Sequence, residues 1–222
     1  MRYFLPLLLL VLFISYCNTQ SYAGLSIATS KNDRHIETLW YQQQLSDRFN
    51  AGVQLRYSRI LYRFVNARAI EDGTTVFVGA VLGFNLKKSE RYRLDFNLTT
   101  SYRYLNNDEN PELPSSTNGL EIDPNFIFGL KLSEKLLFHS GIMLRTAMQF
   151  GDEPINDEQQ PSTIVLTGVS IDKAAHLFSL RTYAGPMTGA TGDTEKFFWQ
   201  LSLGYQYKFG SSAKGVLPFF NF

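Results

Sequence analysis

The chain has 222 residues, of which 44% are hydrophobic and 18% are charged, so it is long enough to bury a core as one domain or two. Its formal net charge of +1 argues against a nucleic-acid partner. Aromatic residues make up 14% of the chain, which is high for a soluble domain and typical of proteins that place aromatic side chains at a membrane interface.

The N-terminal segment has the pattern of a secretory signal peptide. After Arg2, an apolar run extends from Leu5 to Ile14, and Ser21-Tyr22-Ala23 supplies a small-x-small cleavage site. The apolar run is too short to span a bilayer as a helix, and Cys17 lacks the small preceding residue that lipoprotein processing requires. We therefore expect residues 1–23 to be removed, which leaves a mature chain without cysteine.

The rest of the chain alternates apolar and polar residues with a period of two, the pattern of a β-strand with two unlike faces. This pattern predicts ten strands, near 24–31, 35–45, 49–62, 75–86, 92–105, 120–132, 136–149, 163–171, 176–186 and 197–209. After the first loop, the connections are alternately short and long. The long connections are residues 65–74, 106–119, 151–162 and 187–196.

The number of large apolar residues decides which face points inward. Ten strands with about five such residues each would place roughly fifty large side chains inside a small barrel, whose interior holds only a few layers. The apolar faces must therefore point outward, and apolar residues in that number need lipid. We expect an all-β fold, a transmembrane antiparallel up-and-down β-barrel of ten strands over residues 24–209, with short turns at one end and long loops at the other.

The predicted strands 120–132 and 136–149 have a register that can be worked out. A three-residue turn pairs Leu132 with Leu136, and the same register places Asp123 opposite Arg145, with both side chains in the lumen. We therefore expect Asp123 and Arg145 to form an ion pair inside the barrel.

Other charged residues fall on the same inward face. The lumen should also contain the basic residues Arg56 and Arg181 and the acidic Asp95. Because basic lumen residues outnumber acidic ones, the alternative is that Arg145 is unpaired and lines an anion-preferring aqueous pore.

The long loops carry an excess of acidic residues. These are Asp108, Glu109, Glu112, Asp152, Glu153, Asp157, Glu158, Asp193 and Glu195. The simple interpretation is that they keep the loop tips soluble. The functional interpretations are bridging by divalent cations to an anionic membrane surface, or docking of a cationic partner.

The last predicted strand contains a recognisable pattern. Residues 202–209 read SLGYQYKF, in the order polar, any, Gly, any, any, aromatic, any, aromatic. In this strand and in its overall layout the chain resembles bacterial outer-membrane β-barrel proteins, whose C-terminal sorting signal has this order. The resemblance implies location in the outer membrane of a Gram-negative bacterium, contact with outer-membrane lipid, and recognition by the barrel assembly machinery. The residues that carry this assembly signal are Ser202, Gly204, Tyr207 and Phe209. Residues 210–222 follow it, either as a C-terminal extension, which we expect, or as a short final strand.

Few residues of the mature chain suit catalysis or metal binding. Its histidines, His35, His139 and His176, have no metal-ligand spacing with one another. His139-Ser140 invites comparison with outer-membrane lipid hydrolases, but adjacent strand residues point to opposite faces. We expect no catalytic residue, no metal site and no cofactor.

Three functions fit these patterns. The first is a small passive channel or structural barrel with acidic surface loops. The second is a surface-exposed binding or adhesion barrel that acts through its loops. The third is an outer-membrane lipid-modifying hydrolase that uses His139.

Overall fold

The computed structural model describes residues 20–30, 35–65, 68–106, 116–150, 162–187 and 196–209. Ten strands occupy these ranges: β1 (Ser21–Ser30), β2 (His35–Gln44), β3 (Phe49–Val65), β4 (Arg68–Lys88), β5 (Tyr92–Asn106), β6 (Ser116–Lys131), β7 (Leu136–Phe150), β8 (Ser162–Lys173), β9 (His176–Met187) and β10 (Lys196–Phe209). The structure therefore confirms the prediction of ten strands. No helix long and apolar enough to cross a membrane occurs in the described ranges.

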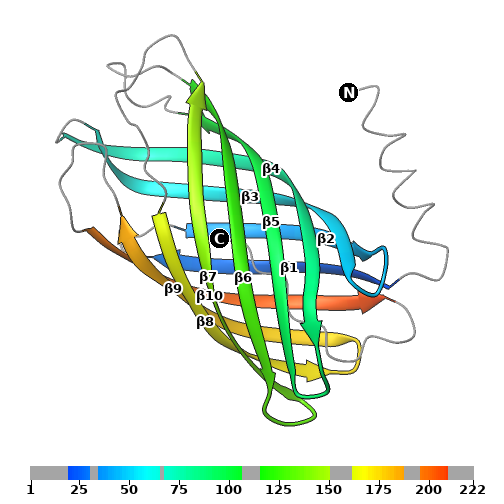
Figure 1. Ribbon diagram of the computed structural model, residues 1–222. Coiled ribbons are helices and arrows are strands. Elements are labelled where there is room, and N and C mark those ends of the chain that lie inside the picture. Colours follow the sequence, from blue (N-terminus) through cyan, green and yellow to red (C-terminus); the bar gives the residue numbers. More distant parts are fainter. Residues whose placement is uncertain are drawn as a thin grey trace.

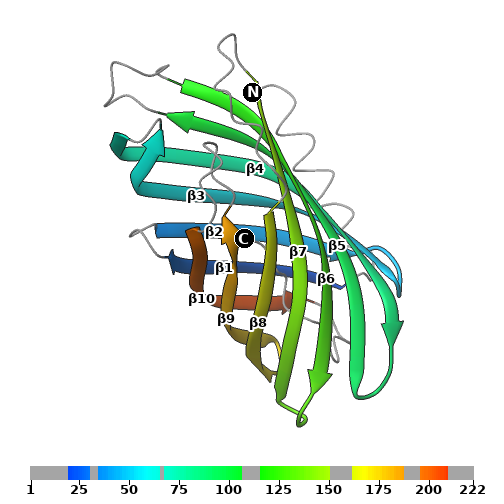
Figure 2. The same ribbon diagram turned by 60° about the vertical axis from the view of Figure 1, so that its left-hand side comes forward.

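The strands form one closed antiparallel barrel in which every strand lies beside its neighbours in the sequence and β1 lies beside β10. Pairing between β1 and β10 runs from Ser21↔Phe209 to Ser30↔Gln200. Figures 1 and 2 show β1 between β2 and β10, and Figure 1 shows the short connections gathered toward the lower right. Because closure pairs the first strand with the last, the described barrel meets the main condition for β-strands to cross a bilayer.

The two faces of the barrel differ as the alternation predicts. On β10, Leu203 on the outer face is 64% exposed, whereas Gln206 on the inner face is 2% exposed. Large apolar side chains lie on the outer face of every strand pair around the barrel, including Leu39, Val78, Phe126, Ile142 and Leu180. This distribution confirms the argument from side-chain volume, because the apolar face points away from the lumen.

The lumen contains two kinds of side chain. An apolar cluster of Ile127, Met143, Ile164, Leu166 and Tyr183 joins β6, β7, β8 and β9. Polar and charged side chains cover most of the inner face of the remaining strands, and they are buried. Most of the inner face of the described barrel is therefore polar.

Three short turns share the sequence Ser-acid-base: residues 46–48, 89–91 and 133–135. In each turn the serine Oγ accepts hydrogen bonds from the backbone N–H groups two and three residues later, at 3.3 Å and at 3.0–3.1 Å. A serine side chain that accepts such bonds stabilises a tight turn locally. The repeated turn fixes the register of the hairpins β2–β3, β4–β5 and β6–β7.

The hairpin β3–β4 is longer than predicted. Residues 65–74 were expected to be a long loop, but β3 and β4 pair with each other as far as Val65↔Arg68. The pairing of β2 with β3 ends at His35↔Arg59, and that of β5 with β4 ends at Thr74↔Asn106. Residues 60–65 and 68–73, the described part of the segment 60–73, therefore extend past the neighbouring strands as a two-stranded ribbon.

Several sequence predictions fall outside the described residues. These are most of the expected signal peptide, the nine acidic loop residues and the segment 210–222. The strand β1 begins at Ser21, so the three residues before the predicted cleavage point pair with β10 and β2. Cleavage after Ala23 stays a prediction.

Candidate functional site

The inner faces of β3, β4, β5 and β6 bring several charged side chains together. The strand pairing places Arg56, Phe77, Arg103 and Gly119 in one row, each opposite the next. Glu121 lies two residues beyond Gly119 on the same face of β6. This part of the lumen lies in the half nearer the long loops, because β5 ends and β6 begins there.

Arg56 and Glu121 form an ion pair between strands that are not neighbours. Arg56 Nη2 lies 2.5 Å from Glu121 Oε2, and the two side chains are 4% and 6% exposed. The guanidinium carbon of Arg56 also lies 3.6 Å from the centre of the Phe77 ring, so the arginine contacts an aromatic face on its way to the carboxylate. Charged groups this deeply buried are retained only with such partners.

Asp123 and Arg145 meet on the next strand pair. Arg145 Nε lies 3.5 Å from Asp123 Oδ1, with the Arg145 side chain 17% exposed. The pairing of β6 with β7 has the register that the three-residue turn predicts, with Gly129 opposite His139. Whether the pair acts as an energetic unit stays a prediction.

Arg103 joins this charged cluster without a carboxylate of its own. Glu121 and Arg145 both lie within electrostatic range of Arg103. The cluster, defined by Arg56, Arg103, Arg145, Glu121 and Asp123, therefore has three guanidinium groups and two carboxylates. It carries one positive charge in excess.

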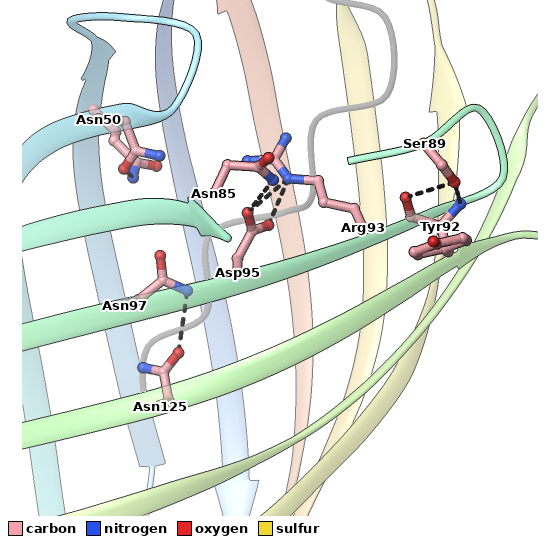
Figure 3. Close-up of polar contacts among 9 residues, drawn as sticks. Asn50, Asn85, Ser89, Tyr92, Arg93, Asp95, Asn97 and Asn125 are labelled. Carbon is pink, nitrogen blue, oxygen red and sulfur yellow. Dashed lines mark hydrogen bonds and ion pairs between the residues drawn. The ribbon is translucent and has the colours of Figure 1, made fainter. Parts of the chain in front are cut away.

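A second polar group lies nearer the short turns (Figure 3). Asp95 accepts hydrogen bonds from Asn85 Nδ2 at 2.7 Å and from Arg93 Nε at 2.8 Å. Asn97 donates to Asn125 Oδ1 at 3.1 Å beside them. The register of β4 against β5 shifts directly after Asn85, so a β-bulge ends this row. The carboxylate of Asp95 balances the guanidinium of Arg93, so we interpret this second polar group as one that stabilises the fold.

Arg181 lies in the lumen on β9. Its Nε and Nη2 donate to Ser179 Oγ at 3.1 and 2.9 Å, and a Cβ at Gly204 would lie 2.5 Å from Nη2. Lys208 forms a further lumen pair with Asp172 at 2.5 Å. Arg181 is 1% exposed, so the glycine on β10 provides the space that the guanidinium occupies.

The histidines show no arrangement for catalysis or metal binding in the described residues. His139 is buried in the lumen, whereas Ser140 on the opposite face donates its hydroxyl to the Leu166 carbonyl oxygen at 3.2 Å. His35 contacts Glu37 at 3.0 Å, and His176 Nδ1 lies 2.9 Å from the Tyr205 hydroxyl. No group of three or more potential metal-ligand side chains occurs in the part of the chain that the structure describes.

The comparisons with known proteins bear on the fold. No protein-family model matches the sequence, and no curated protein does. An outer-membrane channel from Pseudomonas putida F1 is similar in structure, with a TM-score of 0.51, 10% identity, and coverage of 86% of this chain and 96% of the channel. The fold is that of a bacterial outer-membrane β-barrel.

Two other solved structures were matched over nearly their whole length. The β domain of the Bordetella autotransporter BrkA has a TM-score of 0.49 and 8% identity, covering 86% of this chain and all (100%) of that domain. LpxR from Salmonella typhimurium has a TM-score of 0.47 and 9% identity, covering 83% of this chain and 99% of LpxR.

The predicted assembly signal lies on β10, the last strand of the described barrel. Ser202 and Gly204 face the lumen on β10, whereas Tyr207 and Phe209 face outward with their rings 4.8 Å apart. Both aromatic side chains are therefore accessible on the outer face of the barrel. The role of these residues as a signal stays a prediction.

The sequence analysis missed two residues of the charged cluster, Arg103 and Glu121. Glu121 pairs with an arginine 65 positions away on a non-adjacent strand, so hairpin register could not indicate the contact. A signal was present for Arg103, because it shares the inward phase of Asp95 on β5.

Proposed function

We propose that this protein is a small passive channel of the bacterial outer membrane, and that the charged cluster lines the path of its solutes. The observation that supports the proposal is the content of the lumen. Burying an ionic group costs several kcal/mol, and an apolar filling of similar volume is often as stable. Apolar side chains fill the lumen along β6 to β9. The half of the lumen nearer the long loops nevertheless contains the five charged side chains of the cluster. Contact with polar solutes gives a reason to retain them.

The test is conductance of the refolded barrel in a planar bilayer, combined with cysteine labelling. Thr99 lies in the lumen beside the cluster, opposite Asp123, whereas its neighbour Thr100 lies on the outer face. We expect a charged thiol reagent to lower the conductance of Thr99→Cys and to leave that of Thr100→Cys unchanged. Both variants should be made without Cys17, the one cysteine of the sequence.

Two results would contradict the channel. One is a wild-type barrel that gives no conductance above that of detergent alone. The other is complete modification of Thr99→Cys with no change in current. The matched pair separates a block of the lumen from a general effect of the reagent, because the two positions are adjacent in sequence.

A second function, a surface-binding barrel, is favoured by the ribbon of residues 60–73. This ribbon pairs only within itself among the described residues and continues past the neighbouring strands at the long-loop end. Replacing residues 61–72 with a two-residue Asn-Gly turn should spare folding and conductance if the ribbon serves a surface partner. Loss of conductance in the shortened barrel would instead make the ribbon part of the channel entrance.

We propose no enzymatic role for the barrel. The candidate residues for lipid hydrolysis, His139 and Ser140, point to opposite faces of β7. A hydrolytic nucleophile needs its base within hydrogen-bond reach, which this arrangement does not provide. Hydrolysis of extracted outer-membrane lipids that is lost in His139→Ala would overturn this proposal.

A further inference from the structure

Arg103 is the lumen arginine of the cluster that belongs to neither of its two ion pairs, Arg56–Glu121 and Asp123–Arg145. It lies opposite Phe77 on one side and opposite Gly119 on the other. A Cβ at position 119 would lie 3.1 Å from Arg103 Nε and 3.2 Å from Nη2. The guanidinium therefore lies over the glycine of the neighbouring strand, and a larger residue at 119 would displace it.

Two of the three nitrogen atoms of this guanidinium are buried without an acceptor among the described residues. Within the described residues, neither Nε nor Nη2 of Arg103 has a hydrogen-bond partner, and the same is true of Arg56 Nε. A buried donor without a partner costs free energy comparable to its full desolvation, and more when the group is charged. An acceptor from outside the described residues would remove that cost for Nε and Nη2 of Arg103.

The charges of the cluster indicate the sign of that acceptor. Glu121 is held by Arg56 at 2.5 Å, and Asp123 lies beside Arg145. The remaining positive charge belongs to Arg103, whose nearest opposite neighbour in the row, Phe77, is apolar. An anion placed here would neutralise the excess charge and fill the unused donors.

The positions of the donors indicate the shape of the anion. Nε–H and Nη2–H lie on the same side of a guanidinium and form a fork that matches two oxygens of one carboxylate or phosphate. Chloride has one centre and can satisfy the fork less well.

We propose that Arg103 is an oxyanion-binding residue in the lumen, which takes the carboxylate or phosphate group of a small soluble anion. The inference extends the proposed channel function, because it names the class of solute that would bind at the charged cluster. A role for this binding in transport rests on that proposed function. The binding itself does not require conduction.

The experiment measures binding to the refolded barrel in a maltoside detergent, which contains no phosphate. Thermal unfolding is followed while inorganic phosphate or acetate replaces chloride at constant ionic strength. We expect a saturable rise of the unfolding midpoint for the wild type. Arg103→Gln should weaken the apparent affinity at least tenfold, and Arg103→Lys, which keeps the charge but loses the fork, about fivefold or more.

The matched control is Arg48→Gln, which removes an exposed arginine in the turn between β2 and β3 and should bind like the wild type. Mobility on unheated gels checks that each variant is folded. Equal stabilisation of wild type and Arg103→Gln, or no saturable effect over chloride, would overturn the proposal. Stabilisation by a short-chain phospholipid but by neither phosphate nor acetate would also overturn it, since the group would then come from lipid.

The test separates the two proposals. Binding that depends on Arg103 in a barrel without conductance supports the site and refutes the channel. Conductance without such binding refutes the site alone.

Discussion

The ion pair between Arg56 and Glu121 provides the strongest energetic test of the charged cluster. The perturbation is a double-mutant cycle with Glu121→Gln, Arg56→Met and the double variant. Because Arg56 Nη2 lies 2.5 Å from Glu121 Oε2 and both side chains are almost fully buried, each single change leaves one charge without its partner. Removing one partner of such a pair costs about 3–5 kcal/mol.

The excess positive charge of the cluster makes the two single variants unequal. Glu121→Gln leaves three arginines facing one carboxylate, whereas Arg56→Met leaves two arginines facing two carboxylates. Arg103 and Arg145 both lie within electrostatic range of Glu121, so they compensate in part for the loss of Arg56. We therefore expect Glu121→Gln to lie at the upper end of about 3–5 kcal/mol and Arg56→Met at the lower end. The double variant should cost no more than about 2 kcal/mol, since replacing both partners is often close to neutral.

The assay is urea unfolding of the barrel in lipid vesicles, followed by tryptophan fluorescence. The sequence contains two tryptophans, and they report on different faces: Trp40 is 4% exposed in the lumen and Trp199 is 44% exposed on the outer face. Single and double variants should share one slope against urea for the comparison of free energies to hold. A coupling energy below about 0.5 kcal/mol would refute the reasoning, because independent sites add within that margin. A larger cost for Arg56→Met than for Glu121→Gln would refute the charge argument.

Three further predictions follow from the described residues. Asp123→Ala and Arg145→Ala should each lower the free energy of unfolding by about 1–3 kcal/mol in the same assay. This is less than for the Arg56–Glu121 pair, because Arg145 Nε lies 3.5 Å from Asp123 Oδ1 and Arg145 is partly exposed. Strict additivity in the double variant would contradict the pairing. Ala174→Gly should raise the free energy of unfolding by about 0.5–1 kcal/mol, because Ala174 has a φ of 54° in the turn between β8 and β9; an unchanged or lower value would contradict this. Phe209→Asp should impair assembly and leave secretion intact, as measured by the yield in the outer-membrane and periplasmic fractions, whereas Gly204→Arg would also collide with Arg181 and is the less specific variant. A normal outer-membrane yield of Phe209→Asp would locate the signal elsewhere.

Strand positions could be predicted because alternation is a local property of the sequence. The register of β6 against β7 followed from one turn length, since a shift by one residue would turn Phe126 and Phe128 into the lumen. The hairpin β3–β4 was predicted too short because residues 60–73 lie beyond the neighbouring strands. The sequence of this segment, ILYRFVNARAIEDG, does not alternate apolar and polar residues, so the period of two could not mark it as strand.

The contacts inside the lumen were less predictable than the strands. Hairpin register fixes which residues lie opposite one another on adjacent strands, and it therefore located Asp123 and Arg145. Hairpin register does not indicate whether a long side chain contacts a residue on a strand that is not its neighbour. Arg56 passes over Phe77 and reaches Glu121 on β6, so the contact depends on barrel curvature. Barrel curvature is not a local property of β3.

Glycine positions supply part of the missing information, because a glycine on the neighbouring strand leaves space for a long lumen side chain. Arg103 lies over Gly119, and Arg181 lies against Gly204. Trp40 follows the same rule, since a Cβ at Gly24 would lie 2.4 Å from its ring. Three large lumen side chains thus lie against a glycine on an adjacent strand. Replacing Gly119 should therefore displace Arg103 and alter the charged cluster while all five of its charged side chains remain.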